Sequence, residues 1–545
     1  MTRRNKLAAL AILVAAPLAA QPAPMTARDS AFHVLNRLAY GATPGLVDRV
    51  AREGVLAWID RQLGVARVDD PALGALRDQF SILSATPEEL LRTYTRVRQE
   101  RRSEKRSAAD DSAMTPQERM RKMDPEARAL RKIGGELQQL VVVRADRSEH
   151  QLAEVMADFW ANHFNVFYGK NLDRVYLPDY IERTIRPNAL GTFGRLLQAT
   201  AQSPAMLVYL DNAQSVAPGS RPPQVDAIGR GRRAGRNRRA PDSLRKSLQQ
   251  RMPTGLNENY ARELMELHTL GVEGGYTQQD VTEVARVLTG WGVDRPLQGG
   301  GYAFHSWAHD RGRKTVLGVE FPAGRGEDEG ERLLTMLAEH PNTAYFVSGK
   351  LCARFVNDDP PDGCVDDAVR AWKRSSGDIR EVLRAIFRSP DFWAARNVGA
   401  KIKTPLEFVA SAVRAVGGVP DSTVRLAQAV TRLGQPLYLH TAPNGYPERQ
   451  DDWVNSGALL NRMNLAVQLA ANRLPGVTVN LDAVLPLVED HGALVDAVDR
   501  LILGGRMSQE TRKVILDQLA DVPTPSSARA LAVGLAIGGP EFQKQ

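Results

Sequence analysis

Residues 254–291 read TGLNENYARELMELHTLGVEGGYTQQDVTEVARVLTGW, and this stretch predicts two helices in succession. In its first part, residues 255–270, apolar side chains recur at the three- and four-residue spacing of an amphipathic helix. The sequence TQQD, which starts at Thr277, is typical of a helix N-terminus, and Gly290 marks the end of that second helix. The same periodicity dominates most of the remaining chain.

Further helical patterns cover residues 27–40, 44–63, 87–106, 125–144, 152–167, 342–356, 378–387, 405–416, 456–471 and 492–503. Strand patterns are few. Residues 301–307 and 314–317, with the turn sequence Asp310-Arg311-Gly312 between them, predict one β-hairpin. No repeat with a period of 20–50 residues is present, which argues against a solenoid. We therefore predict a mainly α protein, a multi-helix globular array with at most one small β-hairpin.

Composition bounds the class of protein without naming a chemistry. The chain has 545 residues, of which 43% are hydrophobic and 25% charged, as in ordinary soluble globular proteins. These values exclude a collagen, a coiled-coil rod and a wholly disordered chain. We expect one helical domain over residues 27–545, either undivided or built as two packed lobes, 27–216 and 253–545, on the two sides of an insertion.

The first 24 residues have the layout of a secretory signal peptide. Arg3, Arg4 and Lys6 form a positive start, residues 7–20 are apolar, and a run of small residues follows. An N-terminal membrane anchor is the alternative, although the apolar run is short for spanning a bilayer. No later stretch has 18 or more apolar residues, so we expect a periplasmic or secreted protein that is not transmembrane after processing. The export route, general or twin-arginine, stays open.

The net charge of +8 is concentrated in one segment, residues 217–252. This segment holds ten Lys/Arg and two Asp, and ten minus two accounts for the whole excess. It is rich in proline and glycine and poor in large apolar residues, so we expect a disordered basic insertion. Arg230 to Arg251 are candidates for contact with an anionic polymer, and a solvated loop without a partner is the alternative. Nucleic acid is disfavoured because the segment offers no aromatic side chain for bases to stack on.

The chain contains two cysteines, Cys352 and Cys364. Their spacing matches no zinc-binding pattern, and an oxidising compartment permits a disulfide between them. We favour a bridge that ties a helix end to the next element. Two free buried thiols are the alternative.

The helix predicted over residues 255–270 gathers polar side chains on one face. At 100° per residue, Asn259, Glu263 and Glu266 share that face and Arg262 lies beside them. Two carboxylates three residues apart repel each other unless an arginine or a bound cation intervenes. Either this is a site, with a carboxylate as general acid or base or a pair on a metal, or it is an Arg–Glu network that clamps helices together. Asn257, just before the helix, is a further candidate ligand-binding residue.

Histidines supply a second group of candidates. His268 follows Glu266 by two residues and points to the opposite side of a regular helix, so a joint metal chelate requires the helix to end early. His309, Asp310 and Lys314 place a base, an acid and a cation on one turn, where they could surround an anionic substrate. A turn whose histidine and lysine face water is the alternative. By contrast, His163 lies on an apolar helical stripe with Phe159 and is predicted to be a core histidine.

Standard catalytic motifs are absent. The chain has no Gly-x-Ser-x-Gly elbow, no phosphate-binding Walker loop and no His-Glu-x-x-His metal motif, so a divalent metal is conceivable but no motif indicates it. The turn Pro443-Asn444-Gly445-Tyr446-Pro447 offers Asn444 and Tyr446 for lining a binding cleft, although Asn-Gly also marks a plain tight turn.

Several segments together resemble one protein family. They are residues 254–291, FWANHFNVF (159–167), HDRGRKTVLG (309–318), KTPLEFVASAVRA (403–415) and PNGYP (443–447). The chain resembles the domain of unknown function 1800 family from about residue 32 onward, and the basic insertion departs from that family's usual spacing. The resemblance implies a bacterial, frequently exported protein without an established activity. It also implies an exported partner related to sulfatases and phosphatases, because genes of the two families are often neighbours.

Two functions remain open at this point. The first is an enzyme that acts on an envelope or extracellular polymer, with Glu263, Glu266, His268, His309 and Asp310 as catalytic candidates. Asn257, Asn259, Arg262, Lys314, Asn444 and Tyr446 would then bind the substrate. The second is a non-catalytic binding or assembly factor of the cell envelope whose basic loop contacts an anionic partner.

Overall fold

The computed structural model describes residues 25–64, 74, 76–104, 125–170, 172–220 and 255–545. The predicted signal peptide, residues 1–24, lies outside the described residues, as does the predicted basic insertion from residue 221 onward. The first residues of that insertion are ordered against the body of the protein. Ala217 N donates a hydrogen bond to Ala308 O at 2.8 Å, and Ser220 N closes a turn on Ala217 O at 3.0 Å.

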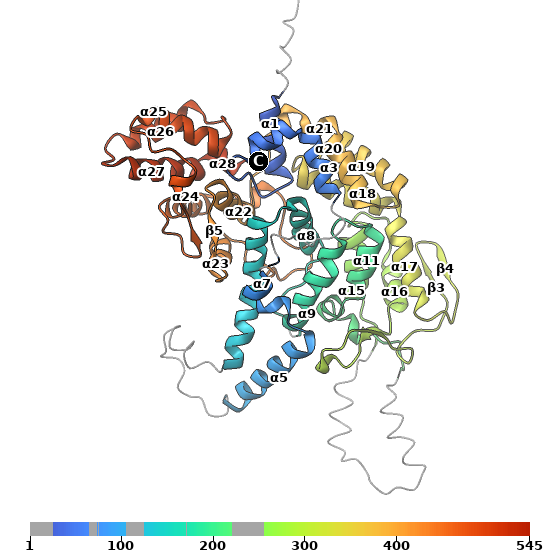
Figure 1. Ribbon diagram of the computed structural model, residues 1–545. Helices are drawn as coiled ribbons and strands as arrows, with labels where there is room; N and C mark the ends of the chain where they lie inside the picture. The colour runs from blue at the N-terminus through green and yellow to red at the C-terminus, as the bar shows by residue number, and fades with distance from the viewer. Residues whose placement is uncertain (1–24, 65–73, 75, 105–124, 171, 221–254) are drawn as a thin grey trace, which may run out of the picture.

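Helices account for most of the described chain (Figure 1). The α-helices are α1 (Ala27–Arg37), α2 (Leu46–Glu53), α3 (Val55–Leu63), α4 (Leu76–Gln79), α5 (Pro87–Glu104), α7 (Pro125–Arg147), α8 (Gln151–His163), α9 (Asp173–Asp179), α10 (Arg186–Asn188), α11 (Phe193–Ala201), α12 (Pro204–Tyr209), α15 (Asn259–Glu263), α16 (Gln278–Val287), α17 (Asp328–Glu339), α18 (Pro341–Phe355), α19 (Asp362–Ser375), α20 (Ile379–Arg388), α21 (Pro390–Trp393), α22 (Pro405–Ala415), α23 (Arg425–Arg432), α24 (Ser456–Ala470), α25 (His491–Val498), α26 (Gln509–Leu519), α27 (Pro525–Gly538) and α28 (Pro540–Gln543). In the described residues, three π-helical segments continue α9, α15 and α25: η4 (Tyr180–Ile185), η6 (Leu264–Thr269) and η11 (Asp499–Leu503). The mainly α prediction is confirmed.

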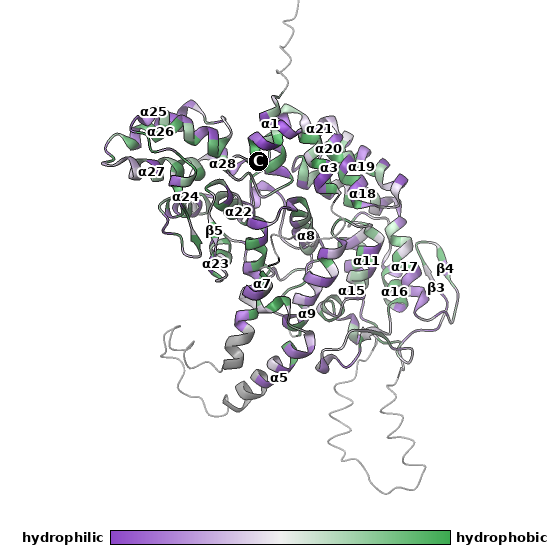
Figure 2. Ribbon diagram, in the orientation of Figure 1, coloured by the Kyte–Doolittle hydropathy of each residue, from purple (hydrophilic) through white to green (hydrophobic). Residues whose placement is uncertain are grey.

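Local sequence explains where the helices begin. Thr277 caps α16, because its hydroxyl accepts a hydrogen bond from Asp280 N while the Asp280 carboxylate accepts one from Thr277 N. Thr404 and Glu407 form the same reciprocal cap at α22. Hydrophobic and hydrophilic residues alternate along most helices in Figure 2, as expected for helices with one face on a core.

The strands form three antiparallel pairs in the described residues. They are β1 (Trp291–Val293) with β2 (Tyr302–Phe304), β3 (Lys314–Val316) with β4 (Val319–Phe321), and β5 (Val419–Pro420) with β6 (Val477–Thr478). The predicted pairing of residues 301–307 with 314–317 is therefore wrong, because each of these strands has another partner. The β3–β4 turn is made by Leu317 and Gly318, both with positive φ (50° and 78°), which is the geometry that two-residue hairpins favour.

Two helices, α8 and α22, run through the middle of the molecule. Every residue of α22 is buried, and so are nearly all residues of α8. A helix that is enclosed on all sides belongs to the core, and the main hydrophobic cluster around these helices extends from Ala31 to Phe542. Polar side chains on α8 and α22 are therefore held inside the protein, where each needs a partner.

A disulfide between Cys352 and Cys364 joins α18 to α19, which confirms the predicted bridge. Both cysteines are fully buried. The chain then passes through α24–α27, grouped at one end of the molecule in Figure 1, and returns to its centre in α28. There Gln545 N donates a hydrogen bond to Lys401 O at 2.8 Å. In the described part of the chain, no helix combines the length and apolar character needed to cross a membrane.

Candidate functional site

Helix α8 carries a polar stripe although it is buried. Glu154, Asp158 and Asn162 follow one another at four-residue spacing, which places them on one side of the helix. Two cavities lie along this stripe, and they adjoin because Asp158 and Tyr438 line both.

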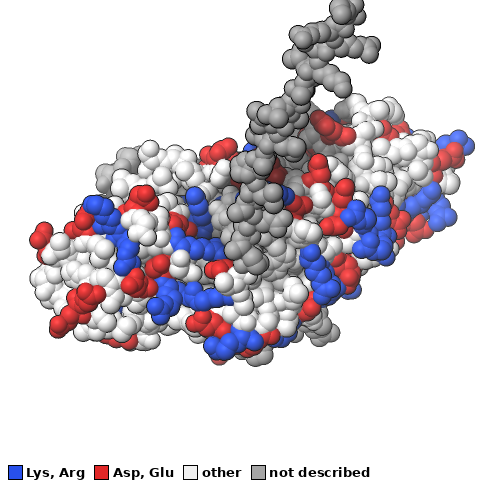
Figure 3. Space-filling model, turned by 90° about the horizontal axis from the view of Figure 1, so that it is seen from above, with Lys and Arg blue, Asp and Glu red and all other residues white. Residues whose placement is uncertain are grey.

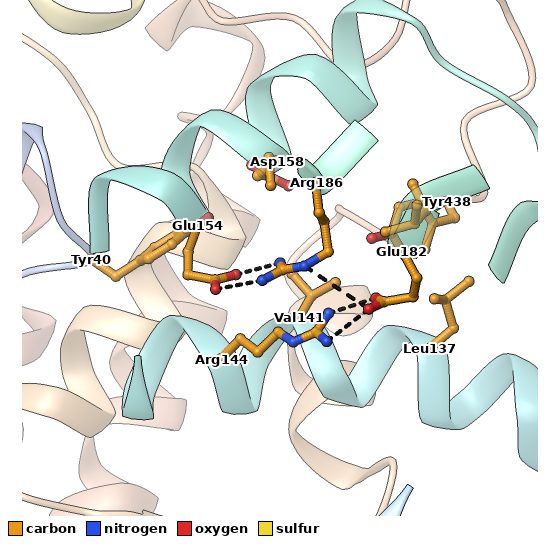
Figure 4. A pocket seen from close by; sticks show the side chains of 11 residues that line it. Tyr40, Leu137, Val141, Arg144, Glu154, Asp158, Glu182, Arg186 and Tyr438 are labelled. Carbon is orange, nitrogen blue, oxygen red and sulfur yellow. Dashed lines mark hydrogen bonds and ion pairs between the residues drawn. The ribbon is translucent and has the colours of Figure 1, made fainter. Parts of the chain in front are cut away.

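The first cavity has a volume of ≈ 20 Å³, which gives room for about one water molecule. Its wall contains two bidentate pairs (Figure 4). Arg186 donates to Glu154 at 2.6 and 2.7 Å, and Arg144 donates to Glu182 at 2.6 and 2.8 Å. Arg186 Nε lies 4.0 Å from Glu182 Oε2, so the four side chains form one continuous chain. The lining residues are Tyr40, Leu137, Val141, Arg144, Glu154, Ala157, Asp158, Ile181, Glu182, Arg186 and Tyr438.

Glu182 reaches this chain from the π-helix η4. A π-helix is rare in proteins and is frequent at functional sites. Burial alone would raise the pKa of Glu182, but the guanidinium of Arg144, with the help of Arg186, holds that pKa below its ordinary value. The irregular turn thus fixes an ionised carboxylate at the cavity wall.

The second cavity has a volume of ≈ 40 Å³, enough for about two or three water molecules. In its wall, Arg354 of α18 donates a hydrogen bond to Glu407 of α22, and it lies 4.0 Å from Glu448 Oε2. Gln545 Nε2 also donates to Glu407, at 3.0 Å. Burial alone would raise the pKa of Glu407, but Arg354 and these donors hold it at about 2. The lining residues are Asp158, Ala161, Asn162, Asn165, Arg354, Thr404, Gln435, Leu437, Tyr438, Tyr446, Pro447 and Glu448.

Asp158 stands between the cavities without a hydrogen-bond donor. Within the described residues nothing donates to its carboxyl, and no dashed line reaches it in Figure 4. Burial raises the pKa of Asp158 to about 7, since the opposing guanidinium of Arg354 is offset by the carboxylates of Glu448 and Glu407. A carboxyl with such a pKa is present in both protonation states at neutral pH, as a general acid or base requires.

Two tyrosines bring hydroxyl groups to the same place. Tyr40 and Tyr438 line the first cavity, and burial raises the pKa of each well above its ordinary value, so both stay protonated. The backbone of Tyr438 has φ +60°, in the left-handed region where side chains other than glycine are strained. Strain of this kind, of the order of 1–3 kcal/mol, concentrates at functional sites.

The turn at residues 443–447 forms one wall of the second cavity and is held by α8. Asn162 donates to Tyr446 O at 2.8 Å and accepts from Tyr446 N at 2.7 Å, while Asn165 donates to Ala442 O at 2.7 Å. Gly445 sits so close that an added Cβ would lie 2.3 Å from Asn162 O, so only glycine fits. Of the predicted binding residues, Tyr446 therefore lines the cavity, whereas Asn444 is exposed.

The predicted carboxylates Glu263 and Glu266 lie at the junction of α15 and η6, and neither lines these two cavities. Both are partly buried. The pKa of Glu263 is raised, first by burial and then by the charge of Glu266, with Arg262 opposing. Arg262 itself donates to Gln278 at 2.8 Å and lies 3.8 Å from Glu258. The predicted pair thus comes together, while the ion-pair partner of Arg262 is a different glutamate.

Asn257 and Asn259 fasten the start of α15. Asn257 Nδ2 donates to Asp211 O at 3.2 Å, and Asn257 Oδ1 accepts from Asn259 N at 2.9 Å. The amide of Asn259 donates to Leu210 O at 3.4 Å. These contacts position the helix on the segment that follows α12.

His268 points into the core and away from Glu266, which is partly exposed. His268 is 1% exposed, and burial, with the nearby charge of Lys350, lowers its pKa to about 3. Its carbonyl oxygen accepts a hydrogen bond from His163 Nε2 at 3.1 Å. The prediction that His163 is a buried core histidine is confirmed.

His309 and Lys314 come together around a partner that lies outside the turn, whereas the Asp310 carboxylate pairs with Arg286 at 2.8 Å. Lys314 Nζ lies 2.6 Å from Glu329 Oε2 of α17, and His309 Nε2 lies 3.6 Å from the same oxygen. The alternative of a turn with water-facing His309 and Lys314 is wrong, because they are 5% and 1% exposed. Lys314 Nζ also donates to two carbonyl oxygens of the turn, so its three N–H groups all have protein acceptors.

No group of three or more His, Cys, Asp or Glu side chains in the described ranges is arranged to hold a metal ion. Asp158, Glu154 and Arg354 were not predicted from the sequence. The four-residue spacing of polar residues along an otherwise apolar helix is the pattern that would have found Asp158. Three of the segments that carry the family resemblance, residues 159–167, 403–415 and 443–447, meet at the second cavity.

Comparison with known proteins places the chain in a family. The family model described as "Protein of unknown function (DUF1800)" matches residues 33–544, so the chain belongs to this family. No curated protein and no solved structure matches the chain significantly.

Proposed function

We propose that this member of the DUF1800 family is a hydrolytic enzyme in which Asp158 transfers protons at the junction of the two cavities. The observation that carries the proposal is a carboxyl group with a pKa of about 7 that faces two cavities and has no donor of its own. An unpartnered buried carboxyl costs folding free energy. Such a cost is typical of sites that are kept for chemistry.

The surrounding groups suit water activation. The cavity volumes of ≈ 20 and ≈ 40 Å³ match water molecules, and water in such places needs two to four polar partners. The Asp158 carboxylate would accept a proton from this water as it attacks, and the protonated form would return the proton to the leaving group. The hydroxyls of Tyr40 and Tyr438 would donate hydrogen bonds to charge that develops on the substrate.

An envelope or extracellular polymer remains the proposed substrate, and the periplasm or exterior the proposed location. Both rest on the signal-like residues 1–24 and on the family resemblance. Contact with an anionic polymer is assigned to the basic segment containing Arg230 to Arg251, because this segment accounts for the net positive charge of the chain. On the face visible in Figure 3, acidic and basic side chains are interspersed. A sulfatase- or phosphatase-like exported protein is the proposed partner.

The pair Glu263 and Glu266 is kept as a second proposed proton-transfer site, because burial and then the charge of Glu266 raise the pKa of Glu263. His268, His309 and Asp310 would support it only through the fold, since His268 and His309 are buried and Asp310 is paired with Arg286 at 2.8 Å. Loss of function in Glu263→Gln with retained activity in Asp158→Asn would favour this site over the cavity.

A non-catalytic assembly factor is the second candidate function. It is favoured by the chain Glu154–Arg186–Glu182–Arg144, which ties α7, α8, η4 and α10 together with every carboxylate paired. A scaffold would need these pairs and would not need Asp158.

The test compares wild type with Asp158→Asn and, as a matched control, Asp173→Asn. Asp173 is also a buried carboxyl whose pKa burial raises, to about 9, but it lines neither cavity. Soluble fragments released from purified envelope polysaccharide and peptidoglycan are measured. We expect turnover by wild type and the control, and a loss of about 100-fold or more in Asp158→Asn with the melting temperature unchanged or raised. No turnover by wild type on any of these polymers, or full activity in Asp158→Asn, would contradict the proposal.

A further inference from the structure

Lys350 of α18 forms a chain with two histidines on the side of α8 away from the polar stripe. Lys350 Nζ lies 3.0 Å from His163 Nδ1, and His163 Nε2 lies 3.1 Å from the backbone oxygen of His268. The carbonyl oxygen can only accept, so Nε2 carries the proton of His163 and Nδ1 is left as an acceptor. Lys350 is therefore the donor to a neutral imidazole whose orientation is fixed from the other side.

The environment keeps both histidines neutral. Burial, followed by the charge of Lys350, lowers the pKa of His163 well below its ordinary value and that of His268 to about 3. The ring of His163 is also fixed by packing: it contacts Phe159 and Phe164, with ring centroids 6.2 and 4.6 Å away. The acceptor atom that Lys350 contacts is thus held in place at all ordinary pH values.

Lys350 differs in its partner from two other inward-facing lysines. Lys314 pairs with Glu329 and Lys401 with Asp358, so their ammonium groups are stabilised by carboxylates. The charge of Glu448 attracts the ammonium group of Lys350. Burial outweighs the attraction by Glu448 and lowers the pKa of Lys350 to about 8. Unlike Lys314, Lys350 is also partly exposed.

We propose that Lys350 is a nucleophilic amine that condenses with a small carbonyl compound, with His163 as its positioning residue. In covalent catalysis, the nucleophile is commonly hydrogen-bonded to a base, and a third group orients that base. The lone pair of the neutral amine attacks the carbonyl carbon, and the C=O electron pair moves to oxygen. One nitrogen proton passes to that oxygen, giving a carbinolamine. Loss of the hydroxyl with the second proton, as water, gives the imine. No oxidant or reductant is consumed.

This site is separate from Asp158 and is independent of the proposed hydrolysis, because Lys350 lines neither of the two cavities. Its natural ligand class is an aldehyde or ketone small enough to reach a half-buried amine. The site can therefore be tested without any assay of polymer turnover.

The experiment is reductive methylation of the intact protein with limiting formaldehyde and cyanoborohydride at pH 7.5, followed by peptide mass spectrometry over time. We expect Lys350 to be labelled at least about 10-fold faster than exposed Lys373, because burial lowers the pKa of Lys350 to about 8 and leaves part of its amine neutral at pH 7.5. Lys403 is the matched control: burial lowers its pKa to about 7, but it is 2% exposed and lies over the Phe542 ring with no histidine. Labelling of Lys350 no faster than Lys373, or equal to Lys403, would overturn the proposal.

Two substitutions of His163 distinguish its positioning of the Lys350 amine from the effect of burial on that amine. His163→Phe keeps an aromatic ring and removes the acceptor, whereas His163→Gln keeps an acceptor. At pH 10, where most of the amine is neutral in every variant, His163→Phe should slow labelling of Lys350 by about 10-fold, and His163→Gln should restore most of the rate. Glu448→Gln removes the charge that raises the pKa of Lys350 and should speed labelling at pH 7. Unchanged rates in His163→Phe and Glu448→Gln would show that Lys350 is only a buried lysine.

Discussion

Two buried polar clusters of this protein use their charges differently. Around Glu329, the ammonium group of Lys314 has three protein acceptors and the pair is sealed by packing. Around Asp158, the arginines are paired with Glu154, Glu182 and Glu407, yet the aspartate itself is left without a donor beside two cavities. The first arrangement explains stability, and the second costs stability. A polar group without a donor marks a candidate site when it also lines a cavity, as Asp158 does.

Breaking the sealed cluster should give the largest effect. Glu329→Gln leaves the Lys314 charge buried without the carboxylate it is paired with, which should lower the free energy of unfolding by about 3–5 kcal/mol. Denaturant unfolding measures this. The double variant Lys314→Met with Glu329→Leu removes both charges and should recover much of the loss. A single variant as stable as wild type would show that this cluster contributes nothing to holding α17 against the turn.

Removing the carboxyl group of Asp158 should raise the stability of the protein, in contrast to the loss expected for Glu329→Gln. The pKa of Asp158 is about 7 in the folded protein and has its ordinary value of 3.8 in the unfolded chain, so the folded state holds a proton that the unfolded state has released between about pH 4 and pH 7. Stability from this group is therefore lost as pH rises through that window. Asp158→Asn lacks the loss, so the variant should become more stable than wild type as pH rises, by up to about 4 kcal/mol at pH 8. Parallel stability curves for the two proteins would contradict this role of Asp158.

The next prediction concerns the disulfide that holds α18, the helix that carries Arg354. Cys352 lies two residues before Arg354, and its bridge to Cys364 holds α18 on α19. Replacing both cysteines by alanine should lower stability by about 3 kcal/mol, because a short loop is no longer closed in the unfolded chain. Mass spectrometry with and without reductant verifies the bridge first. If the double-alanine variant has the wild-type melting temperature, the disulfide does not stabilise the packing of α18 on α19.

The smallest effect is expected for the exposed arginine of the predicted carboxylate cluster. Arg262 lies 3.8 Å from Glu258, and their side chains are 41% and 36% exposed. Arg262→Ala should change the free energy of unfolding by less than about 1 kcal/mol, as is usual for surface pairs. Thermal unfolding at low and high salt measures this, and a loss of several kcal/mol would show that Arg262 clamps α15 to α16 after all.

Sequence periodicity predicted the helices because burial of an apolar face leaves a regular trace. The Thr277 cap and the Cys352–Cys364 bridge were predicted for similar reasons, since each depends on residues close together in the chain. The wrong hairpin depended on a choice of strand partner, which tertiary packing decides. The sequence of residues 302–304 does not specify which strand they pair with, and in the folded protein they pair with β1.

The candidate site was harder to predict because its members are far apart in sequence. Asp158 lies in a helix whose apolar stripe indicated His163, while the opposite stripe, Glu154–Asp158–Asn162, carried the polar groups of the site. Arg354 and Glu407 come from two other helices, and no local pattern links them to Asp158. Glu263 and Glu266 were prominent because they are neighbours, but a cavity requires distant segments to meet.

The most direct test of the role proposed for Asp158 is the titration of its carboxyl group. Infrared spectra of wild type and Asp158→Asn, recorded from pH 4 to pH 9, isolate the carbonyl band of one protonated carboxyl group in their difference. We predict that this band persists at pH 6 and disappears with a midpoint near pH 7. A band that is already lost at pH 5 would show an ordinary, ionised aspartate and would contradict the role proposed for it.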